Sequence, residues 1–254
     1  MDMFDLNGRA AVVTGGNGGI GLGFARGLAR AGASVAVWGR NEQKNAVAVD
    51  ELEALGATAI GVRCDVTSAA DVEAAMATTL DRFGRVDSMF ANAGVGSRGT
   101  RFVEMTIEEW RDIFRVNSEG AFLTLQAAAR HMVERGEGGS LVLTASVSSV
   151  MGMPRGEHYA ATKAGAIAIA RGLAVEFGRY RIRANAVVPG WIDTDMTTGL
   201  LDSEGFTQRV LPRIPGGRWG APSDFEGIAV YLASDASAWH TGDVITIDGG
   251  YTVF

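Results

Sequence analysis

The chain has 254 residues, and its 29 acidic side chains outnumber the 23 basic ones, for a formal net charge of −6. This balance argues against a general nucleic-acid binder, which gains affinity by neutralising phosphates. The single cysteine, Cys64, excludes an intrachain disulfide and a Cys-rich zinc module, so a reducing, cytoplasmic location is expected. The three histidines are scattered, so no metal site is predicted. No membrane partner is expected, because no uncharged apolar run reaches the ~18–20 residues of a membrane span.

Short β-rich runs alternate with longer Ala- and Leu-rich segments of helical periodicity along the chain. The predicted strands are Arg9–Thr14, Ser34–Trp38, Thr58–Arg63, Val86–Ala91, Ser140–Ala145, Ile182–Val188 and Val244–Ile247. The predicted helices are Gly19–Ala31, Asn41–Leu55, Ala69–Phe83, Thr106–His131 and Tyr159–Phe177. The fourth of these helices is expected to break near Asn117.

This alternation predicts βαβ units, in which crossover helices join parallel strands. The strands are short apolar runs, which is typical of strands covered on both faces. No linker rich in proline, serine or charge divides the chain. We therefore predict one α/β domain over residues 1–254, with a doubly wound, mainly parallel, seven-stranded sheet and helices on both faces.

The segment Thr14–Gly21 joins the first strand to the first helix and is rich in glycine. Ligands bind beyond the carboxyl ends of such strands, and the N–H groups of a helix N-terminus suit a pyrophosphate. Two glycine registers fit, namely Gly16, Gly18 and Gly21, or Gly15, Gly19 and Gly21. A P-loop is excluded because no Lys-Ser/Thr follows the glycines. A connector without a ligand is the alternative interpretation.

Tyr159 and Lys163 stand four residues apart on a predicted helix and therefore share a face. An ammonium beside a phenol favours the phenolate, so Lys163 is expected to lower the pKa of Tyr159 from its reference near ~10. Such a tyrosine can donate or accept a proton nearer neutral pH. A solvated surface pair is the alternative. Ser146 lies 13 residues before Tyr159, and this spacing favours it over Ser148 and Ser149 as the working hydroxyl.

In combination, seven motifs resemble the short-chain dehydrogenase/reductase family, in its single-domain branch. The motifs are TGGNGGIG at Thr14–Gly21, CDV at Cys64–Val66, NAG at Asn92–Gly94, VN at Val116–Asn117, Ser146, YAATK at Tyr159–Lys163 and PG at Pro189–Gly190. The resemblance extends from Leu6 to Asp248–Gly250. It implies a Rossmann-like fold, and it selects Gly15, Gly19 and Gly21 as the glycine register.

The resemblance also implies catalytic roles. Tyr159 is the implied general acid/base, and Ser146 hydrogen-bonds the substrate oxygen and stabilises developing charge there. Lys163 lowers the Tyr159 pKa and holds the nicotinamide ribose. Asn117 breaks its helix and anchors a water that links Lys163 to solvent, with a simple helix cap as the alternative.

A larger set of residues is implied to bind the cofactor. These are Gly15, Asn17, Gly19, Ile20, Gly21, Arg40, Asp65, Val66, Asn92, Ala93, Gly94, Tyr159, Lys163, Pro189, Gly190, Ile192 and Thr194. Ile20 and Asn92 would lie along the cofactor, and residues 188–194 would meet the nicotinamide carboxamide. Asp65 would bond the adenine amine, or else serve as a turn residue.

The end of the second strand bears on which nicotinamide is used. In dinucleotide folds an acid there binds the ribose 2′-OH, whereas arginine suits a 2′-phosphate. Here Gly39 takes the place of the acid, and Arg40 follows with a charge-assisted hydrogen bond to offer. The glycine loop has Asn17 where some NADP-preferring relatives have a basic residue. NADP is therefore the expected cofactor, and NAD is the alternative.

The loops after the fourth, fifth and sixth strands are expected to set specificity for a small-molecule substrate. They carry Arg98, Arg101, Arg155, His158, Trp191, Asp193 and Asp195. The three arginines are candidates for binding an anionic substrate, with surface solvation as the alternative, and His158 would face substrate or fill a surface or core position. Residues 191–219 form the expected substrate lid.

The predicted activity is NAD(P)-dependent interconversion of a secondary alcohol and a ketone. A 3-oxoacyl-thioester reductase and a sugar or polyol dehydrogenase both fit this prediction. The alternative is a catalytically silent nucleotide-binding sensor, which the intact set of Ser146, Tyr159 and Lys163 disfavours.

The helix after the fifth strand is apolar around nearly its whole circumference, so its outer face needs a cover. The stretch Ala121–Ala129 is also apolar. A homotetramer is therefore expected, with helices near 118–131 and 159–177 forming one contact and Val244–Phe254 a second. A simply exposed, alanine-rich face is the alternative.

Overall fold

The computed structural model describes residues 3–254, so residues 1 and 2 of the predicted domain lie outside the described part. Its seven strands form one parallel sheet in the order β3-β2-β1-β4-β5-β6-β7. The strands are β1 (Ala10–Thr14), β2 (Ser34–Gly39), β3 (Ala59–Arg63), β4 (Ser88–Ala91), β5 (Gly139–Thr144), β6 (Ile182–Pro189) and β7 (Val244–Ile247). The order reverses direction between β1 and β4, where doubly wound sheets bind ligands. The predicted fold class is confirmed.

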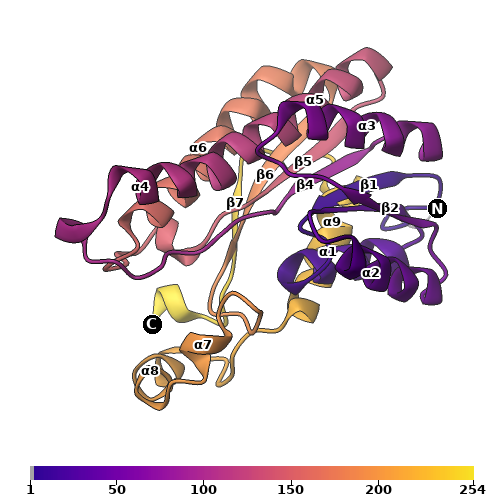
Figure 1. Ribbon diagram of the computed structural model, residues 1–254. Helices are drawn as coiled ribbons and strands as arrows, with labels where there is room; N and C mark the ends of the chain where they lie inside the picture. Colours follow the sequence, from indigo (N-terminus) through magenta and orange to yellow (C-terminus); the bar gives the residue numbers. More distant parts are fainter. Residues whose placement is uncertain (1–2) are drawn as a thin grey trace.

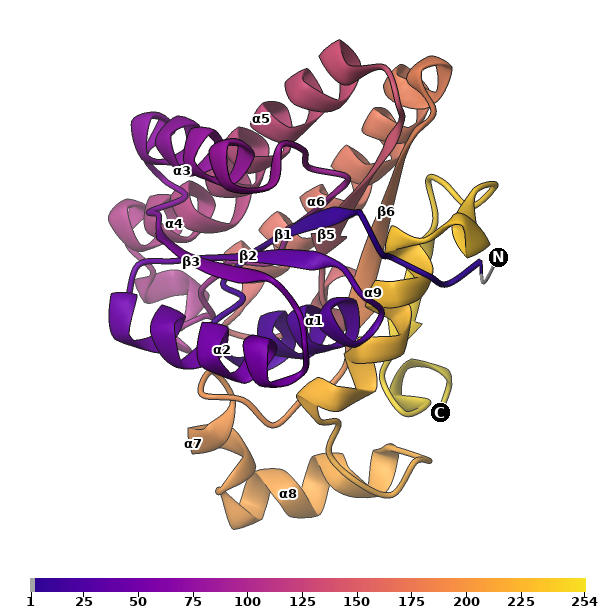
Figure 2. The same cartoon turned by 90° about the vertical axis from the view of Figure 1, so that its right-hand side faces the viewer.

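Helices cover both faces of the sheet (Figure 1). One face carries α1 (Gly19–Arg30), α2 (Glu42–Ala54) and α9 (Glu226–Ala233), and the other carries α3 (Ala69–Phe83), α5 (Gly120–Arg135) and α6 (Glu157–Phe177) (Figure 2). Two buried apolar cores result. Successive side chains of β1 alternate between them, since Val12 belongs to the core under α3, α5 and α6 and Val13 to the other.

The fourth predicted helix is interrupted as expected. Helix α4 (Ile107–Phe114) runs into a π-helical turn over Arg115–Glu119 before α5 begins. Asn117 sits in this turn and is buried. A π-turn adds a residue to the helical repeat and is frequent at functional sites.

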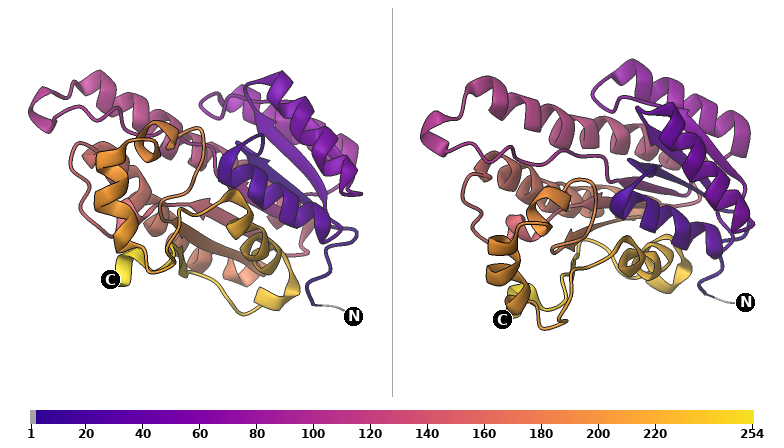
Figure 3. Two further views of the ribbon diagram at one scale, coloured as in Figure 1. Left: turned by 90° about the horizontal axis from the view of Figure 1, so that it is seen from below. Right: turned by 60° about the horizontal axis from the view of Figure 1, so that its bottom comes forward.

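Three helices were not predicted from the sequence. Two are the short α7 (Thr198–Leu201) and α8 (Glu204–Val210), which stand out from the body of the domain (Figure 3). The third, α9, packs against α1, where a side chain at Gly23 or Gly27 would collide with the backbone of Pro222 or Glu226. Since α9 spans only eight residues and is mostly apolar, it shows no readable helical periodicity. Within residues 3–254, no helix is long and apolar enough to cross a membrane.

Candidate active site

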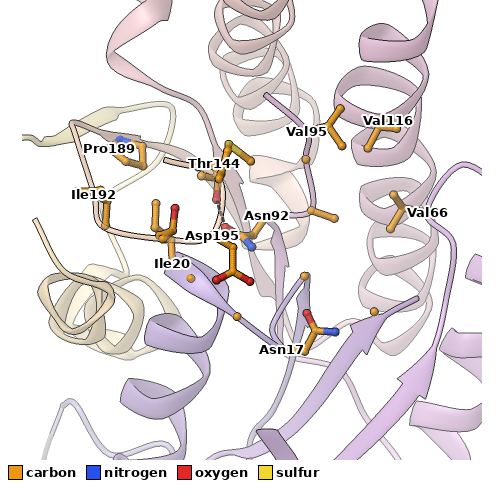
Figure 4. A pocket seen from close by; sticks show the side chains of 18 of the residues that line it. Asn17, Ile20, Val66, Asn92, Val95, Val116, Thr144, Pro189, Ile192 and Asp195 are labelled. Atoms are coloured by element: carbon orange, nitrogen blue, oxygen red, sulfur yellow. Dashed lines mark hydrogen bonds between the residues drawn. The ribbon is translucent and has the colours of Figure 1, made fainter. Parts of the chain in front are cut away.

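A cavity of about 810 Å³ lies at the carboxyl ends of the strands (Figure 4). It is bordered by the glycine loop after β1, the ends of β2 and β3, the segments after β4 and β5, the start of α6, and the segment after β6. Most of the predicted site residues line it: Gly15, Asn17, Gly19, Ile20, Arg40, Asp65, Val66, Asn92, Ala93, Gly94, Ser146, Tyr159, Lys163, Pro189, Gly190, Ile192 and Thr194. Gly21 and Asn117 do not. One cavity thus brings together segments from most of the chain.

The glycine loop owes its shape to residues without a side chain. Gly15 and Gly19 have φ of 63° and 51°, a region that disfavours other residues. Gly21 lies behind the loop, where a Cβ would collide with the Gly15 carbonyl and the Asn92 amide. Helix α1 starts after Gly18 with no side-chain cap and no acidic residue in its first turn. Its first N–H groups are therefore suited to an anionic ligand.

Asn92 ties three strands together beneath this loop. Its Nδ2 donates to the Thr14 carbonyl at 3.0 Å. Its Oδ1 accepts from Thr144 Oγ1 at 3.1 Å (Figure 4). Thr14 Oγ1 in turn accepts from the N–H groups of Asn92 and Ala93, both at 3.0 Å. These bonds fix the relative positions of the ends of β1, β4 and β5.

At the end of β2 the backbone is enclosed by two asparagines. Asn45 Nδ2 donates to the Gly39 carbonyl at 2.8 Å, and Asn17 Nδ2 donates to Asn45 Oδ1 at 2.6 Å. A Cβ at Gly39 would collide with Asn17 Nδ2 and would lie 2.6 Å from Asn45 Oδ1, so a side chain there would require both asparagine side chains to move. Arg40 is exposed and borders the same end of the cavity.

Asp65 lines the cavity and also holds its own turn, as the turn-residue alternative predicts. Its Oδ1 accepts from the Thr67 N–H at 3.0 Å and from Thr67 Oγ1 at 2.9 Å. The hydrogen bond from the Thr67 backbone, with help from its hydroxyl and from Arg40, lowers the pKa of Asp65.

Lys163 and Tyr159 enter the cavity from the first turns of α6. The Lys163 ammonium is buried, donates to the Thr144 carbonyl at 2.7 Å, and lies 5.7 Å from the centre of the Tyr159 ring. Burial lowers the pKa of Lys163 to about 8. Burial also raises the pKa of Tyr159, with a hydrogen bond to Ser146 acting in the opposite direction. This result differs from the prediction that Lys163 lowers the Tyr159 pKa. Burial of Tyr159 dominates, and the Lys163 ammonium donates to the Thr144 carbonyl instead.

Ser146 lines the cavity, whereas Ser148 and Ser149 do not. Ser146 Oγ accepts from the Ser148 N–H at 3.2 Å, and Ser149 donates to the Ser146 carbonyl. The loop around Ser146 is therefore held by its own short-range hydrogen bonds.

Asn117 lies outside the cavity and acts on its wall. Its Oδ1 accepts from the Val95 N–H at 2.8 Å, and its Nδ2 donates to the Val95 carbonyl at 3.0 Å and to Thr162 Oγ1 at 3.2 Å. The amide clamps the segment after β4 to α6 and does not cap a helix, which excludes the simple-cap alternative.

Most of the substrate-loop candidates lie away from the cavity. Arg98, Arg101, Arg155, His158, Trp191 and Asp193 do not line it, and only Asp195 does. Arg101 pairs with Glu104 at 3.1 Å, and His158 is fully buried beside Trp110 at 6.4 Å between ring centres. A core position, one of its two alternatives, therefore describes His158.

The sequence analysis missed Lys44 on α2 and Met196 and Thr197 in the lid, all of which line the cavity. Lys44 Nζ pairs with Asp195 Oδ2 at 2.8 Å and so connects α2 to the lid. No motif marks these residues, because α2 and the lid meet only in the folded chain.

Comparison with known proteins agrees with this geometry. Residues 15–252 match the family model described as "Enoyl-(Acyl carrier protein) reductase". Gluconate 5-dehydrogenase of Gluconobacter oxydans (strain 621H) is 38% identical over 252 residues, covering 99% of this chain and 98% of that protein. The 5-keto-D-gluconate 5-reductase of Escherichia coli (strain K12) is 35% identical, with the same coverage of both chains.

Solved structures are equally similar. A short-chain type dehydrogenase/reductase from Mycobacterium marinum has a TM-score of 0.94 at 40% identity, covering 99% of this chain and 98% of the other. A gluconate 5-dehydrogenase from Burkholderia cenocepacia J2315, in complex with NADP and tartrate, has a TM-score of 0.94 at 37% identity, covering 100% and 98%. The chain belongs to the short-chain dehydrogenase/reductase family. It is an oxidoreductase acting on CH–OH groups, as predicted, and the sensor alternative is not supported.

Proposed function

We propose that this protein is an NADP-dependent dehydrogenase/reductase that interconverts a secondary hydroxyl and a ketone on a sugar acid or related polyol. The observation that carries the proposal is the joining, in one cavity, of the glycine loop with Ser146, Tyr159 and Lys163. The activities of the relatives support the sugar-acid class over a 3-oxoacyl thioester. The family model's reductase description is the reason to keep a thioester in the test.

The residues present fit a nicotinamide dinucleotide phosphate. The uncapped start of α1 and the open glycine loop suit the pyrophosphate. At the other end, the β2 terminus carries no carboxylate, and Arg40 and Lys44 both border the cavity. Two solved relatives are described as complexes with NADP. When bound, the cofactor supplies or accepts the hydride.

The chain's own groups handle the proton and the developing charge. Tyr159 donates a proton to the reacting oxygen in reduction and removes it in oxidation. Ser146, which hydrogen-bonds Tyr159, donates to the same oxygen and stabilises negative charge on it. Lys163, held by Thr144, places a cation beside the Tyr159 ring and binds the nicotinamide ribose. Asn117 is a positioning residue, since it holds Val95 at the cavity wall; we also assign it the water that leads from Lys163 to solvent.

The whole chain is proposed to act as one catalytic domain, with residues 191–219 as the substrate lid. The lid's base is a parallel bridge between Ile192 and Gly220, and Asp195 connects it to α2. Because the lid borders the cavity at Thr194–Thr197, its movement would admit and enclose substrate.

A homotetramer is proposed as the working assembly. The outer face of α6 exposes a row of small residues with one valine, namely Ala161, Ala164, Ala168, Gly172 and Val175. Val175 is 86% exposed, and Phe122 on α5 is 51% exposed. Such surfaces suit close helix contact with a second copy. Cytoplasmic residence is proposed because the one thiol, Cys64, is free and buried.

A substrate panel tests the proposal. Gluconate, 5-ketogluconate, a polyol and a 3-oxoacyl thioester are each assayed by nicotinamide absorbance with NADP(H) and with NAD(H). We expect turnover of a sugar acid with NADP(H) at higher kcat/KM than with NAD(H). Turnover of the thioester alone, or a preference for NADH, would overturn the corresponding part of the proposal.

A further inference from the structure

A second cavity, of about 660 Å³, lies at the amino ends of the strands, opposite the carboxyl ends that border the active site. It is bordered by Gly139 and Ile182, which begin β5 and β6, and by Arg9 and Asp87, which immediately precede β1 and β4. It shares no lining residue with the active-site cavity. Its volume is within the ~300–1,000 Å³ range of small-ligand pockets. The cavity is therefore an independent candidate site.

The lining is dominated by arginine. Five arginines border this cavity, namely Arg9, Arg85, Arg135, Arg181 and Arg183. Three carboxylates accompany them, those of Asp87, Glu137 and Asp235. Five cations against three anions leave an excess of two positive charges, although the whole chain carries −6. A local charge of this sign, inside an otherwise acidic protein, attracts anions.

Each of the three carboxylates already forms an ion pair with an arginine. Asp87 pairs with Arg85 at 2.7 Å and with Arg135 at 3.0 Å, and Asp235 pairs with Arg9 at 2.7 Å. Glu137 pairs with Arg85 at 3.1 Å. Within residues 3–254, no carboxylate forms an ion pair with Arg181 or Arg183. These two guanidinium groups supply the excess charge.

Arg183 is the inner member of this pair. Its Nη2 donates to the Leu232 carbonyl at 2.6 Å, while its Nη1 is buried and meets no acceptor among the described residues. Burial, with a contribution from the Arg9 charge, lowers the pKa of Arg183 to about 10, so it remains a cation at neutral pH. A buried donor without an acceptor is costly. An anion in the cavity would remove that cost once the Arg183 side chain turns Nη1 toward it.

Arg181 is the outer member and immediately precedes β6, the strand that carries Arg183. It adopts φ of 60°, an uncommon conformation for a residue with a side chain, and its Nη2 donates to the Gly136 carbonyl at 2.8 Å. Arg181 is exposed and borders the cavity. Both residues border the cavity, so the charges of both guanidinium groups act on a ligand bound there.

We propose that this cavity binds a small organic or inorganic polyanion, with two or more phosphate or carboxylate groups, held chiefly by Arg181 and Arg183. Guanidinium groups bind both kinds of oxyanion through paired hydrogen bonds. The cavity volume favours a molecule of the size of pyrophosphate or citrate over a single halide ion. The site does not depend on the proposed substrate, because it lies outside the active-site cavity.

Calorimetric titration of the holoenzyme tests this proposal. The protein is first saturated with NADP⁺, so that the glycine loop cannot capture the probe, and pyrophosphate or citrate is then added at constant ionic strength. We expect one probe molecule to bind per chain. We expect Arg181→Gln and Arg183→Gln to weaken binding by roughly tenfold or more, the effect of losing one charge-assisted hydrogen bond.

The matched control is Arg82→Gln, which removes an exposed arginine on α3 that does not line the cavity. The site is supported if Arg82→Gln keeps wild-type affinity while Arg181→Gln and Arg183→Gln lose affinity. The probe that binds more tightly shows whether phosphate or carboxylate is the preferred group. Absence of binding to wild type, or equal weakening in all three variants, overturns the proposal. So does wild-type affinity for the probe in Arg181→Gln. If Arg183→Gln does not fold, the exposed Arg181 decides the question.

Discussion

The floor of the active site and its lid are built in opposite ways. The floor is a set of interlocked polar groups in which Thr14, Asn92, Thr144 and Lys163 bond one another or one another's backbone across three strands and α6. The lid has exposed apolar side chains, and its link to the body of the domain through Lys44 and Asp195 lies at the surface. The floor is therefore fixed by hydrogen bonds that form on folding, whereas the lid is joined to α2 by an exposed ion pair. Under the proposed function, chemistry depends on the first region and substrate choice on the second.

The largest effect should come from removing the proton at the floor. We expect Tyr159→Phe to lower turnover by roughly 10²-fold or more, because general acid–base catalysis contributes on that scale. Cofactor binding, followed by fluorescence titration, should persist because the ring remains. The matched control is Tyr180→Phe, which lies after α6 and outside the cavity. Near-normal turnover in Tyr159→Phe would remove this residue from the mechanism.

A smaller effect is expected at the cofactor end of the floor. Arg40→Ala should raise KM for NADPH by roughly 10–150-fold, the consequence of losing one charged contact to the 2′-phosphate. KM for NADH should change little, since NADH lacks that group. Steady-state kinetics with both cofactors measures the ratio. Equal changes in the two constants would show that Arg40 does not read the phosphate.

The clamp on the cavity wall should influence both folding and activity. Asn117→Ala leaves the N–H and carbonyl groups of Val95 without their partners, so we expect a loss of about 1–3 kcal/mol in the free energy of unfolding. Denaturant titration measures this change. As a control, Thr106→Ala removes the N-cap of α4, outside the cavity, at a cost of about 1 kcal/mol, and we expect turnover to be unaffected. If turnover falls no further in Asn117→Ala than in Thr106→Ala, the clamp has no positioning role.

The smallest effect on stability is expected in the lid. Asp195→Asn removes an exposed ion pair, and such pairs contribute little to folding, so the melting temperature should stay within error of wild type. KM for the substrate should change measurably even though the melting temperature does not, because Asp195 borders the cavity. Asp202→Asn, also exposed in the lid, is the control. A substantially lowered melting temperature would mean that the lid is as firmly built as the floor.

Much of the fold was predictable because parallel strands buried on both faces leave a plain apolar signature. The bounds of α3 and β7 agree with the sequence prediction, and the break at Asn117 lies inside the observed π-turn. Helix α9 was not predictable, because it is short and because its packing against the glycines of α1 exists only in the folded chain.

The site residues also fall into those that the sequence predicted and those that it could not. Residues within motifs, such as Gly15, Ser146 and Tyr159, were predicted to lie together and do line one cavity. Lys44 was missed because its place at the site follows from how α2 faces the lid. The Tyr159 pKa was judged from its spacing to Lys163 alone, which contains no information on burial or on the competing Thr144 carbonyl.

The bridge at the base of the lid makes that segment a separable insert. The Gly220 N–H donates to the Trp191 carbonyl at 2.9 Å, and the Asp193 N–H donates to the Gly220 carbonyl at 2.8 Å, so both ends of the segment are fastened to each other. A loop whose ends are already joined pays little for added length, about 0.6 kcal/mol for each doubling. We therefore expect that lids of other lengths and sequences can be grafted between Thr198 and Trp219, with the cavity-lining residues 194–197 and the floor kept intact. Such an exchange would be a practical starting point for redirecting this enzyme to new alcohols.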